Sequence, residues 1–319
     1  MARKAETGER ERHPWSTLYR IAIMAFSVFI LLDAFVIPRS YAVVSNSSSS
    51  SSSSTQSTTA SSSTSNSSSD SSSSAVITSD SYTNGDTQIQ ITTDRVNGTT
   101  VYVADIYVSD ISEIQTAFAQ NVYGKNVTET TSSMAEDNNA ILAINGDYYG
   151  AQNSGYVIRN GVLYRSEAAS SDQEDLVIYS DGTFEVICEG DITAQELLDN
   201  GAWQVFSFGP GLIENGEIAV TQGEETGKAM ASNPRTAIGQ VSDGHYVMVV
   251  ADGRTSESSG LSLYELAEYM QGLGCTTAYN LDGGGSSTMY FNGEVINNPT
   301  TNGDTIKERK VSDIVYIGA

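Results

Sequence analysis

The chain has 319 residues and a formal net charge of −23 at pH 7, from 39 acidic and 16 basic residues. Six of the basic residues lie within residues 1–40, so residues 41–319 hold 10 basic and 35 acidic residues. A body this acidic repels nucleic acid and anionic membrane surfaces at long range, which excludes nucleic acid as a partner. A phosphate-bearing ligand would therefore have to be bound by a few well-placed cations.

The N-terminal segment, residues 1–42, has the features of a targeting sequence. An apolar run from Ile21 to Leu32 follows several basic residues and is shorter than the roughly 20 apolar residues of a membrane-spanning helix. Ser40-Tyr41-Ala42 has small residues at the positions that favour signal cleavage after Ala42. The segment is predicted to be either a cleaved signal peptide or an uncleaved signal anchor. Both alternatives predict an extracytoplasmic body, either secreted or held at the cell envelope by one N-terminal helix.

Residues 43–79 are predicted to be a disordered linker. The stretch 45–74 consists almost entirely of Ser, Thr and Asn, and it has no apolar surface to offset the entropy lost on ordering. Residues 80–319 then remain as one folded domain.

Asx-Gly pairs divide this domain into short apolar or alternating segments, a pattern typical of tight hairpins. Hairpins are predicted over Tyr156–Tyr164, Leu176–Ile187, Gly211–Val220, Ile238–Val250 and Thr288–Ile296, and a further strand over Val101–Val108.

One helix is clearly predicted, over Ser262–Leu273, where Ser262 and Glu265 can form a capping box. Weaker helical patterns cover Ser112–Val122 and Thr193–Asn200. The predicted fold class is α+β, a single domain of mostly antiparallel sheet with hairpins and a few packed helices.

Histidine and cysteine are scarce, which limits the chemistry. His13 and His245 are the two histidines, so a histidine-rich zinc site is excluded. No cofactor is required by the sequence, although Ca²⁺ or Mg²⁺ bound by oxygen ligands stays possible given the surplus of carboxylates. Cys188 and Cys275 could pair in an oxidising compartment or stay as two buried thiols.

Two segments join an apolar strand to polar side chains. In the first, a buried strand through Ile144 leads into Asn145, Asp147 and Tyr148, and the simpler interpretation is an ordinary Asn-Gly turn. In the second, Pro234 fixes the backbone before Arg235, whose planar fork of donors matches phosphate oxygens. The alternative for Arg235 is a structural ion pair.

Two further segments place charge or glycine directly after a strand. Asp252 and Arg254 share one turn, where they could act as an acid or base and a phosphate contact, or simply pair with each other. Asp282 is followed by Gly283, Gly284 and Gly285, whose backbone N–H groups can approach a ligand closely, and then by Ser286.

In this order, the segments resemble the phosphodiester glycosidase family, hydrolases that remove N-acetylglucosamine from a sugar phosphodiester and whose bacterial members are often described as exopolysaccharide biosynthesis proteins. The resemblance spans about residues 86–318 and rests on Asn145–Tyr149, Pro234–Gly239, Asp252–Arg254, Asn280–Ser287 and Arg309–Ile314. The first motif commonly reads Asn-Gly-Gly-Phe-Phe in the family, whereas this chain has Asp147 and two tyrosines.

The resemblance implies hydrolysis of a carbohydrate or sugar-phosphate substrate. Residue chemistry then suggests Asp282 and Asp252 as acid, base or nucleophile, and Arg235 and Arg254 as the charges that stabilise the departing phosphate. Backbone N–H groups of the three glycines would assist, while the remaining candidates would contact the substrate: Asn145, Asp147, Tyr148 and Ser286. The alternative is a non-catalytic module that binds cell-wall or capsular polysaccharide. The enzymatic interpretation requires these separate loops to meet in one pocket.

Overall fold

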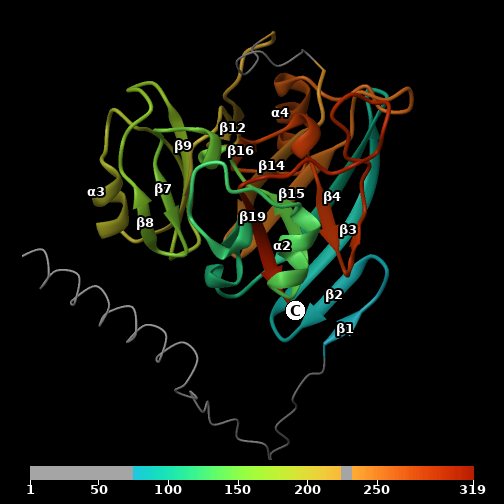
Figure 1. The fold of residues 1–319 in the computed structure, drawn as a ribbon, viewed down its shortest axis with the longest axis horizontal. Coiled ribbons are helices and arrows are strands. Elements are labelled where there is room, and N and C mark those ends of the chain that lie inside the picture. Colours follow the sequence, from blue (N-terminus) through green and yellow to red (C-terminus); the bar gives the residue numbers. More distant parts are fainter. Residues whose placement is uncertain (1–74, 224–231) are drawn as a thin grey trace, which may run out of the picture. The chain divides into compact units, whose positions relative to one another are not determined.

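The computed structural model describes residues 75–223 and 232–319, which form three sheets and three α-helices (Figure 1). No helix within these ranges is long and apolar enough to span a membrane. The predicted signal segment, residues 1–42, lies outside the described residues, as does most of the predicted linker. The first strand begins at Val76, so the described sheet includes the last residues of the 43–79 stretch.

The largest sheet has nine strands. They are β1 (Val76–Ile77), β2 (Ser81–Asn84), β3 (Thr87–Val96), β4 (Thr99–Tyr107), β12 (Gly211–Glu214), β13 (Glu217–Ile218), β14 (Arg235–Ser242), β15 (His245–Ala251) and β16 (Thr277–Leu281). Their spatial order is β1-β2-β3-β4-β15-β14-β16-β12-β13.

Two five-stranded sheets complete the fold. The first, in the order β10-β9-β11-β7-β8, contains β7 (Val157–Arg159), β8 (Val162–Arg165), β9 (Glu174–Tyr179), β10 (Phe184–Cys188) and β11 (Ala202–Phe206). The second, in the order β18-β17-β6-β19-β5, contains β5 (Gln115–Phe118), β6 (Ala140–Asn145), β17 (Met289–Phe291), β18 (Glu294–Val295) and β19 (Asp313–Gly318). Every strand pairing in the described residues is antiparallel, so the fold is mostly antiparallel β with few helices, the strand-rich end of the predicted class.

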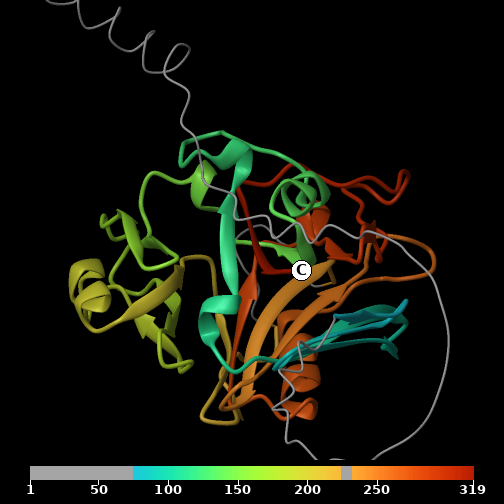
Figure 2. The same ribbon diagram turned by 90° about the horizontal axis from the view of Figure 1, so that it is seen from below.

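The nine-stranded sheet is buried on both faces at its centre. Along β15, Val247 and Val249 pack with helix α4 (Leu263–Gly272), whereas Met248 and Val250 pack into the core shared with the two smaller sheets. This alternation follows from the two-residue period of a strand. Figure 2 shows α4 lying on one face of the sheet. Burial on both faces explains why β15 is a continuous apolar run in the sequence from Tyr246 to Ala251.

The five predicted hairpins are present, as β7–β8, β9–β10, β12–β13, β14–β15 and β17–β18, and the predicted strand over Val101–Val108 corresponds to β4. At three of their turns the asparagine has a left-handed backbone, with φ of 50° at Asn160, 52° at Asn215 and 48° at Asn292. Asparagine and glycine tolerate this conformation better than other residues, so local turn chemistry sets the strand register.

Two of the three predicted helices are confirmed and the third is wrong. Helices α4 and α3 (Ala194–Asp199) both begin with complete capping boxes, at Ser262 and Thr193. The predicted helix over Ser112–Val122 is instead two short 3₁₀ turns flanking β5, which pairs with β19 about 200 residues later in the chain. Tertiary pairing overrides the local pattern there. Helix α2 (Thr131–Asp137) was not predicted, and it packs on the sheet that contains β6 and β19.

Cys188 and Cys275 are both free thiols, and of the two buried thiols that the second alternative expected, Cys275 is buried whereas Cys188 is half-buried. Burial raises the pKa of the Cys275 thiol to about 12, so this side chain behaves as an inert apolar group.

The Ser262 cap gives a direct test of the α4 assignment. Ser262→Ala should lower the free energy of unfolding by about 1 kcal/mol, because the hydroxyl that accepts from the Glu265 N–H is lost. Urea unfolding followed by circular dichroism measures the change. The control Ser256→Ala, an exposed serine outside any helix, should stay within about 0.5 kcal/mol of the wild type. Equal effects of the two substitutions would contradict the assignment.

Candidate active site

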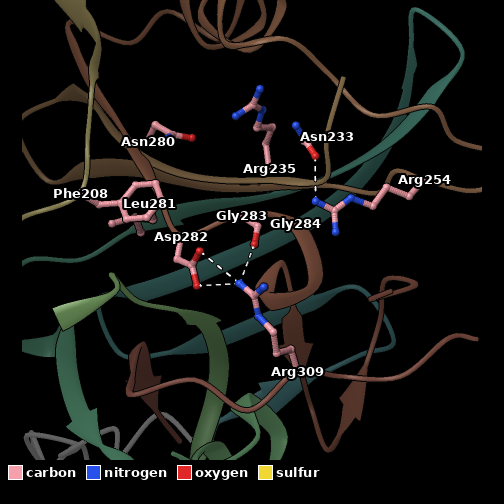
Figure 3. Close-up of a pocket in the computed structure, with 10 residues that line it drawn as sticks. All are labelled: Phe208, Asn233, Arg235, Arg254, Asn280, Leu281, Asp282, Gly283, Gly284 and Arg309. Carbon is pink, nitrogen blue, oxygen red and sulfur yellow. Dashed lines mark hydrogen bonds and ion pairs between the residues drawn. The ribbon is translucent and has the colours of Figure 1, made fainter. Parts of the chain in front are cut away.

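A pocket of about 160 Å³ opens where the ends of β14 and β16 meet the loops that follow them (Figure 3). We call it the arginine pocket. It is lined by Phe208, Asn233, Arg235, Arg254, Asn280, Leu281, Asp282, Gly283, Gly284 and Arg309.

Strand register explains why these distant residues meet. Thr236 on β14 lies opposite Leu281 on β16, so Arg235 and Asp282 fall on the same end of neighbouring strands. Arg235 also lies opposite Ala251 on β15, which places the turn carrying Arg254 beside it. The loops predicted to converge therefore do so, and Arg235, Arg254 and Asp282 line one pocket.

Asp282 is the carboxyl group at the centre of this pocket. Its Oδ2 accepts hydrogen bonds from the Ser286 hydroxyl at 2.6 Å and from Arg309 Nη2 at 3.1 Å. Burial raises the pKa of the Asp282 carboxyl, while the charge of Arg309 and the hydrogen bonds from Ser286, Arg309 and the Gly283 backbone act in the opposite direction. Asp282 is thus a buried, firmly oriented carboxyl with an elevated pKa.

Three guanidinium groups line the pocket together with this one carboxyl, and Arg309 contacts it directly. Arg254 Nη2 donates to the Asn233 side chain at 2.9 Å and its Nη1 to the Thr301 carbonyl at 2.6 Å, so neither contact is with a carboxylate. Burial and the nearby charges of Arg309 and Arg235 lower the pKa of the Arg254 guanidinium. Among the described residues that line the arginine pocket, Asp282 is the single acidic side chain. Such an excess of positive charge favours an anion, and the planar forks suit phosphate oxygens.

Arg309 and Asn280 line the pocket but were not proposed as site residues from the sequence. Arg309 lies within the closing motif, and its position in a basic pair of an otherwise acidic body could have marked it. Asn280 donates from Nδ2 to the Gly209 carbonyl at 2.7 Å, while its buried Oδ1 has no hydrogen-bond partner among the described residues. Asn280 stands two residues before Asp282, on the same face of β16, so strand periodicity could have indicated it.

Asp252 does not line the arginine pocket. Its side chain is 3% exposed and accepts hydrogen bonds from the Asn298 backbone at 2.9 Å and from the side chains of Asn297 and Asn298, both at 3.1 Å. This position ties the loop after β18 to the end of β15.

Asn145 also lies outside the pocket lining, although it contacts Asp282. Its Nδ2 donates to the Asp282 carbonyl at 2.6 Å, and its Oδ1 accepts from the Thr236 hydroxyl at 2.9 Å and from the Thr288 N–H at 3.2 Å. Asn145 therefore joins the end of β6 to β14 and β16 and holds the Asp282 backbone in place.

The three glycines act mainly through close packing. The Gly284 N–H donates to the Pro234 carbonyl at 2.8 Å, and that of Gly283 to the Asp282 carboxyl, so these donors already have protein partners. Gly284 has φ of +61°, and a Cβ there would lie 2.9 Å from Arg254 Nη2. The glycines allow Arg254 to approach the Asp282 loop closely. Ser286 orients Asp282 and also accepts from Arg309 Nε at 2.9 Å.

Asp147 and Tyr148 line a smaller neighbouring pocket of about 60 Å³, which we call the Tyr148 pocket and which shares Asp282 and Arg309 with the arginine pocket. The Asp147 carboxylate is paired with the buried Arg159 at 2.8 Å and accepts from the backbone N–H groups of Tyr149 and Ser207. Tyr148 is 42% exposed and forms part of the pocket wall.

Arg159 also pairs with Asp313, at 2.9 Å, so one cation serves two buried carboxyl groups. Burial raises the pKa of Asp313 to about 7. The positive charge of Arg159 acts to lower this pKa, whereas the negative charges of Asp147 and Asp282 act to raise it. The carboxylate of Asp147, where the family commonly has glycine, is therefore paired with the buried Arg159.

Within residues 75–223 and 232–319, no group of three or more His, Cys, Asp or Glu side chains is arranged to hold a metal ion.

Comparison with known proteins identifies the family. The phosphodiester glycosidase family model matches residues 138–318, which include most of the sheet core and the arginine pocket. This chain belongs to the phosphodiester glycosidase family. It is 34% identical over 180 residues to the SPbeta prophage-derived uncharacterized protein YomE of Bacillus subtilis, a match covering 55% of this chain and 28% of that protein.

Mammalian relatives match the same region. The chain is 33% identical over 176 residues to human N-acetylglucosamine-1-phosphodiester alpha-N-acetylglucosaminidase, covering 50% of this chain and 33% of that protein. It thus spans about a third of the length of the curated relatives it matches.

Solved structures share the fold. The catalytic domain of the zebrafish enzyme of the same name, auto-inhibited by its pro-peptide, superposes with a TM-score of 0.57 at 24% identity, over 73% of this chain and 83% of that one. A hypothetical protein from Synechocystis gives a TM-score of 0.51 at 16% identity, over 73% of this chain and 62% of that one.

The Arg159 cluster predicts a specific titration. Asp147→Asn should bring the pKa of Asp313 below about 7, because it removes a negative charge that raises this pKa and leaves Arg159 to Asp313 alone. Carboxyl carbon NMR titration measures the shift.

The same change alters how stability depends on pH. A carboxyl whose folded pKa is raised binds its proton more tightly in the native state, so stability falls as pH rises from about 4 to about 7. This fall should be shallower in Asp147→Asn. The exposed control Asp86→Asn should leave the Asp313 pKa unchanged, and an unchanged value in Asp147→Asn would show that the two carboxyl groups are not coupled.

Proposed function

We propose that the protein is an extracytoplasmic hydrolase that cleaves the glycosidic bond of a sugar 1-phosphodiester in a cell-surface polymer or exopolysaccharide. One observation carries this proposal: three guanidinium groups and one buried, oriented carboxyl line a single pocket. The names of the mammalian relatives, which are N-acetylglucosamine-1-phosphodiester alpha-N-acetylglucosaminidases, support N-acetylglucosamine as the first sugar to test.

The arginine pocket suits the charge changes of this reaction. Cleavage of the bond between the anomeric carbon and the phosphate oxygen passes through an oxocarbenium-like state, and the departing phosphate monoester takes both bonding electrons. Water completes the reaction by adding to the anomeric carbon. Arg235, Arg254 and Arg309 would stabilise the negative charge on the phosphate as the bond breaks, an effect worth about 3 kcal/mol per well-placed donor.

Asp282 would act at the anomeric carbon in its ionised form, directly or through a water molecule. A phosphate is a weakly basic leaving group, so the reaction depends less on a second carboxyl that protonates it. The contacts from Ser286 and Arg309 fix the direction of the carboxylate and keep part of it ionised despite burial. Asn280, whose Oδ1 remains available, would accept a hydrogen bond from a sugar hydroxyl.

The proposal includes no metal, because the arginines supply the positive charge that a divalent cation provides at other phosphate sites. Extracytoplasmic placement is supported by the apolar segment Ile21–Leu32 and the Ser-rich stretch that follows it. These features would keep the domain close to a cell-envelope substrate.

Removal of the pocket charges should abolish activity. In buffer containing EDTA, Arg235→Ala should lower kcat/KM for phenyl α-N-acetylglucosaminyl phosphate at least about 100-fold, because the transition state loses a charged donor. Asp282→Asn should eliminate turnover while retaining substrate binding. Release of free N-acetylglucosamine is measured, and circular dichroism checks folding.

The matched control is Arg95→Ala, which removes an exposed arginine from β3 and should behave as the wild type. Full activity in Arg235→Ala would exclude the anion-binding role. A wild-type protein that binds the substrate without turning it over would favour the polysaccharide-binding alternative.

The pH profile distinguishes the ionised form of Asp282 from the protonated one. If the carboxylate is the active form, kcat rises with pH through the Asp282 pKa, which lies above the ordinary aspartate value. Arg309→Gln removes a charge and a hydrogen bond that lower this pKa, so the acidic limb should move to higher pH. An acidic limb that stays in place, or moves to lower pH, would contradict the proposed role.

A further inference from the structure

The basic residues of the described chain are concentrated on one path. Residues 75–223 and 232–319 contain nine Lys and Arg residues against 32 Asp and Glu residues. Six of the nine line the arginine pocket, the Tyr148 pocket or a third pocket beyond them: Lys125, Arg165, Arg235, Arg254, Arg309 and Lys310. Of the 32 acidic residues, only Asp147 and Asp282 line these pockets, and both are paired with arginines.

The three pockets adjoin one another. The Tyr148 pocket shares Asp282 and Arg309 with the arginine pocket, and it shares Gly150 with the third pocket, which we call the Lys125 pocket. The pockets thus follow one another from the three arginines past Tyr148 to Lys125, and basic residues line each of them.

The Lys125 pocket has a volume of about 230 Å³ and no acidic residue in its lining. Its wall includes Tyr123 and Tyr149, whose rings stack with centroids 5.3 Å apart, and the side-chain amides of Gln152 and Asn153. Tyr149 is buried beneath Tyr123, so the half-buried Tyr123 ring and the exposed amides are the groups suited to the mixed apolar and hydroxyl surface of a sugar ring.

This pocket is preformed rather than a chance surface hollow. The guanidinium of Arg165, 9% exposed, donates from Nε to the Gly155 carbonyl and from Nη1 to the carbonyls of Tyr149 and Gln152, which fixes the backbone of the wall. The Lys125 ammonium group donates to the Asn153 side-chain oxygen at the rim, so its charge is held over the opening. Lys310 adds a second exposed charge in the Tyr148 pocket.

We infer that the Tyr148 and Lys125 pockets bind the continuation of the substrate, and that the substrate is a chain of sugars joined through successive phosphodiesters. This inference rests on the proposed function of the arginine pocket. The arginines hold the phosphate next to the cleaved bond, the tyrosines and amides contact the next sugar, and Lys125 and Lys310 meet the next phosphate. A neutral polysaccharide would bring no negative charge to Lys125 and Lys310, whereas a repeating anionic chain matches both the order of the pockets and their charge.

The test compares two probes by calorimetry on the full-length Asp282→Asn protein, which leaves the probes uncut. One probe is phenyl α-N-acetylglucosaminyl phosphate, and the other is a synthetic chain of three N-acetylglucosamine residues joined through phosphodiesters. The chain should bind at least about tenfold more tightly, and the difference should shrink as salt is raised. Adding Lys125→Ala should weaken binding of the chain about threefold to tenfold, and more than it weakens binding of the single phosphodiester.

Lys307→Ala is the matched control, since Lys307 is an exposed lysine of the neighbouring loop that lines none of the three pockets. Equal affinity of the two probes, or equal effects of the two lysine substitutions, would overturn the inference. Turnover of the single phosphodiester by the wild-type protein is measured separately. Turnover without preference for the chain would leave the proposed function standing while removing the extended site.

Discussion

The contact between Asn145 and Asp282 is the constraint on which the site depends. The Asn145 side chain donates to the Asp282 carbonyl, and the Asp282 N–H donates to the Gly146 carbonyl at 3.3 Å. These bonds join the end of β6 in one sheet to the end of β16 in another. Since both groups are buried, loss of either partner would leave an unsatisfied polar atom, which makes the junction costly to open. These two bonds hold the Asp282 backbone, and so they set the position of the carboxyl that would face the sugar.

Charge is distributed in two layers around this junction. Arg235, Arg254 and Arg309 line the arginine pocket, and among the described residues of its lining Asp282 is the one acidic side chain. Arg159 lies on the buried side, where it pairs with both Asp147 and Asp313, and burial raises the pKa of Asp313 to about 7. A buried ion needs a partner because desolvation is expensive, and the inner layer meets this need with its own opposite charges. The difference separates charges that stabilise the domain from charges that can bind substrate.

Local chemistry made much of the fold predictable from sequence. Asn-Gly and Asp-Gly pairs marked the hairpins, and Ser-x-x-Glu and Thr-x-x-Glu marked two helix starts, because each signal acts within a few residues. The segment Ser112–Val122 was misassigned because its partner β19 lies near the other end of the chain. The site residues were likewise predictable where a local motif marked them and not where a long-range contact placed them. Glycine-rich and strand-end motifs located Arg235 and Asp282, whereas Arg309 joins them only through the path of a long loop, and the inward contacts of Asp252 with Asn297 and Asn298 left no trace in the sequence.

The two free thiols have a consequence for how this domain matures. Neither Cys188 nor Cys275 forms a crosslink, so the sheets are held by packing and hydrogen bonds alone and do not depend on an oxidant or a disulfide isomerase. Passage between compartments of different redox potential would leave its covalent structure unchanged. Recombinant protein made in a reducing cytoplasm should consequently be equivalent to protein recovered from an oxidising one.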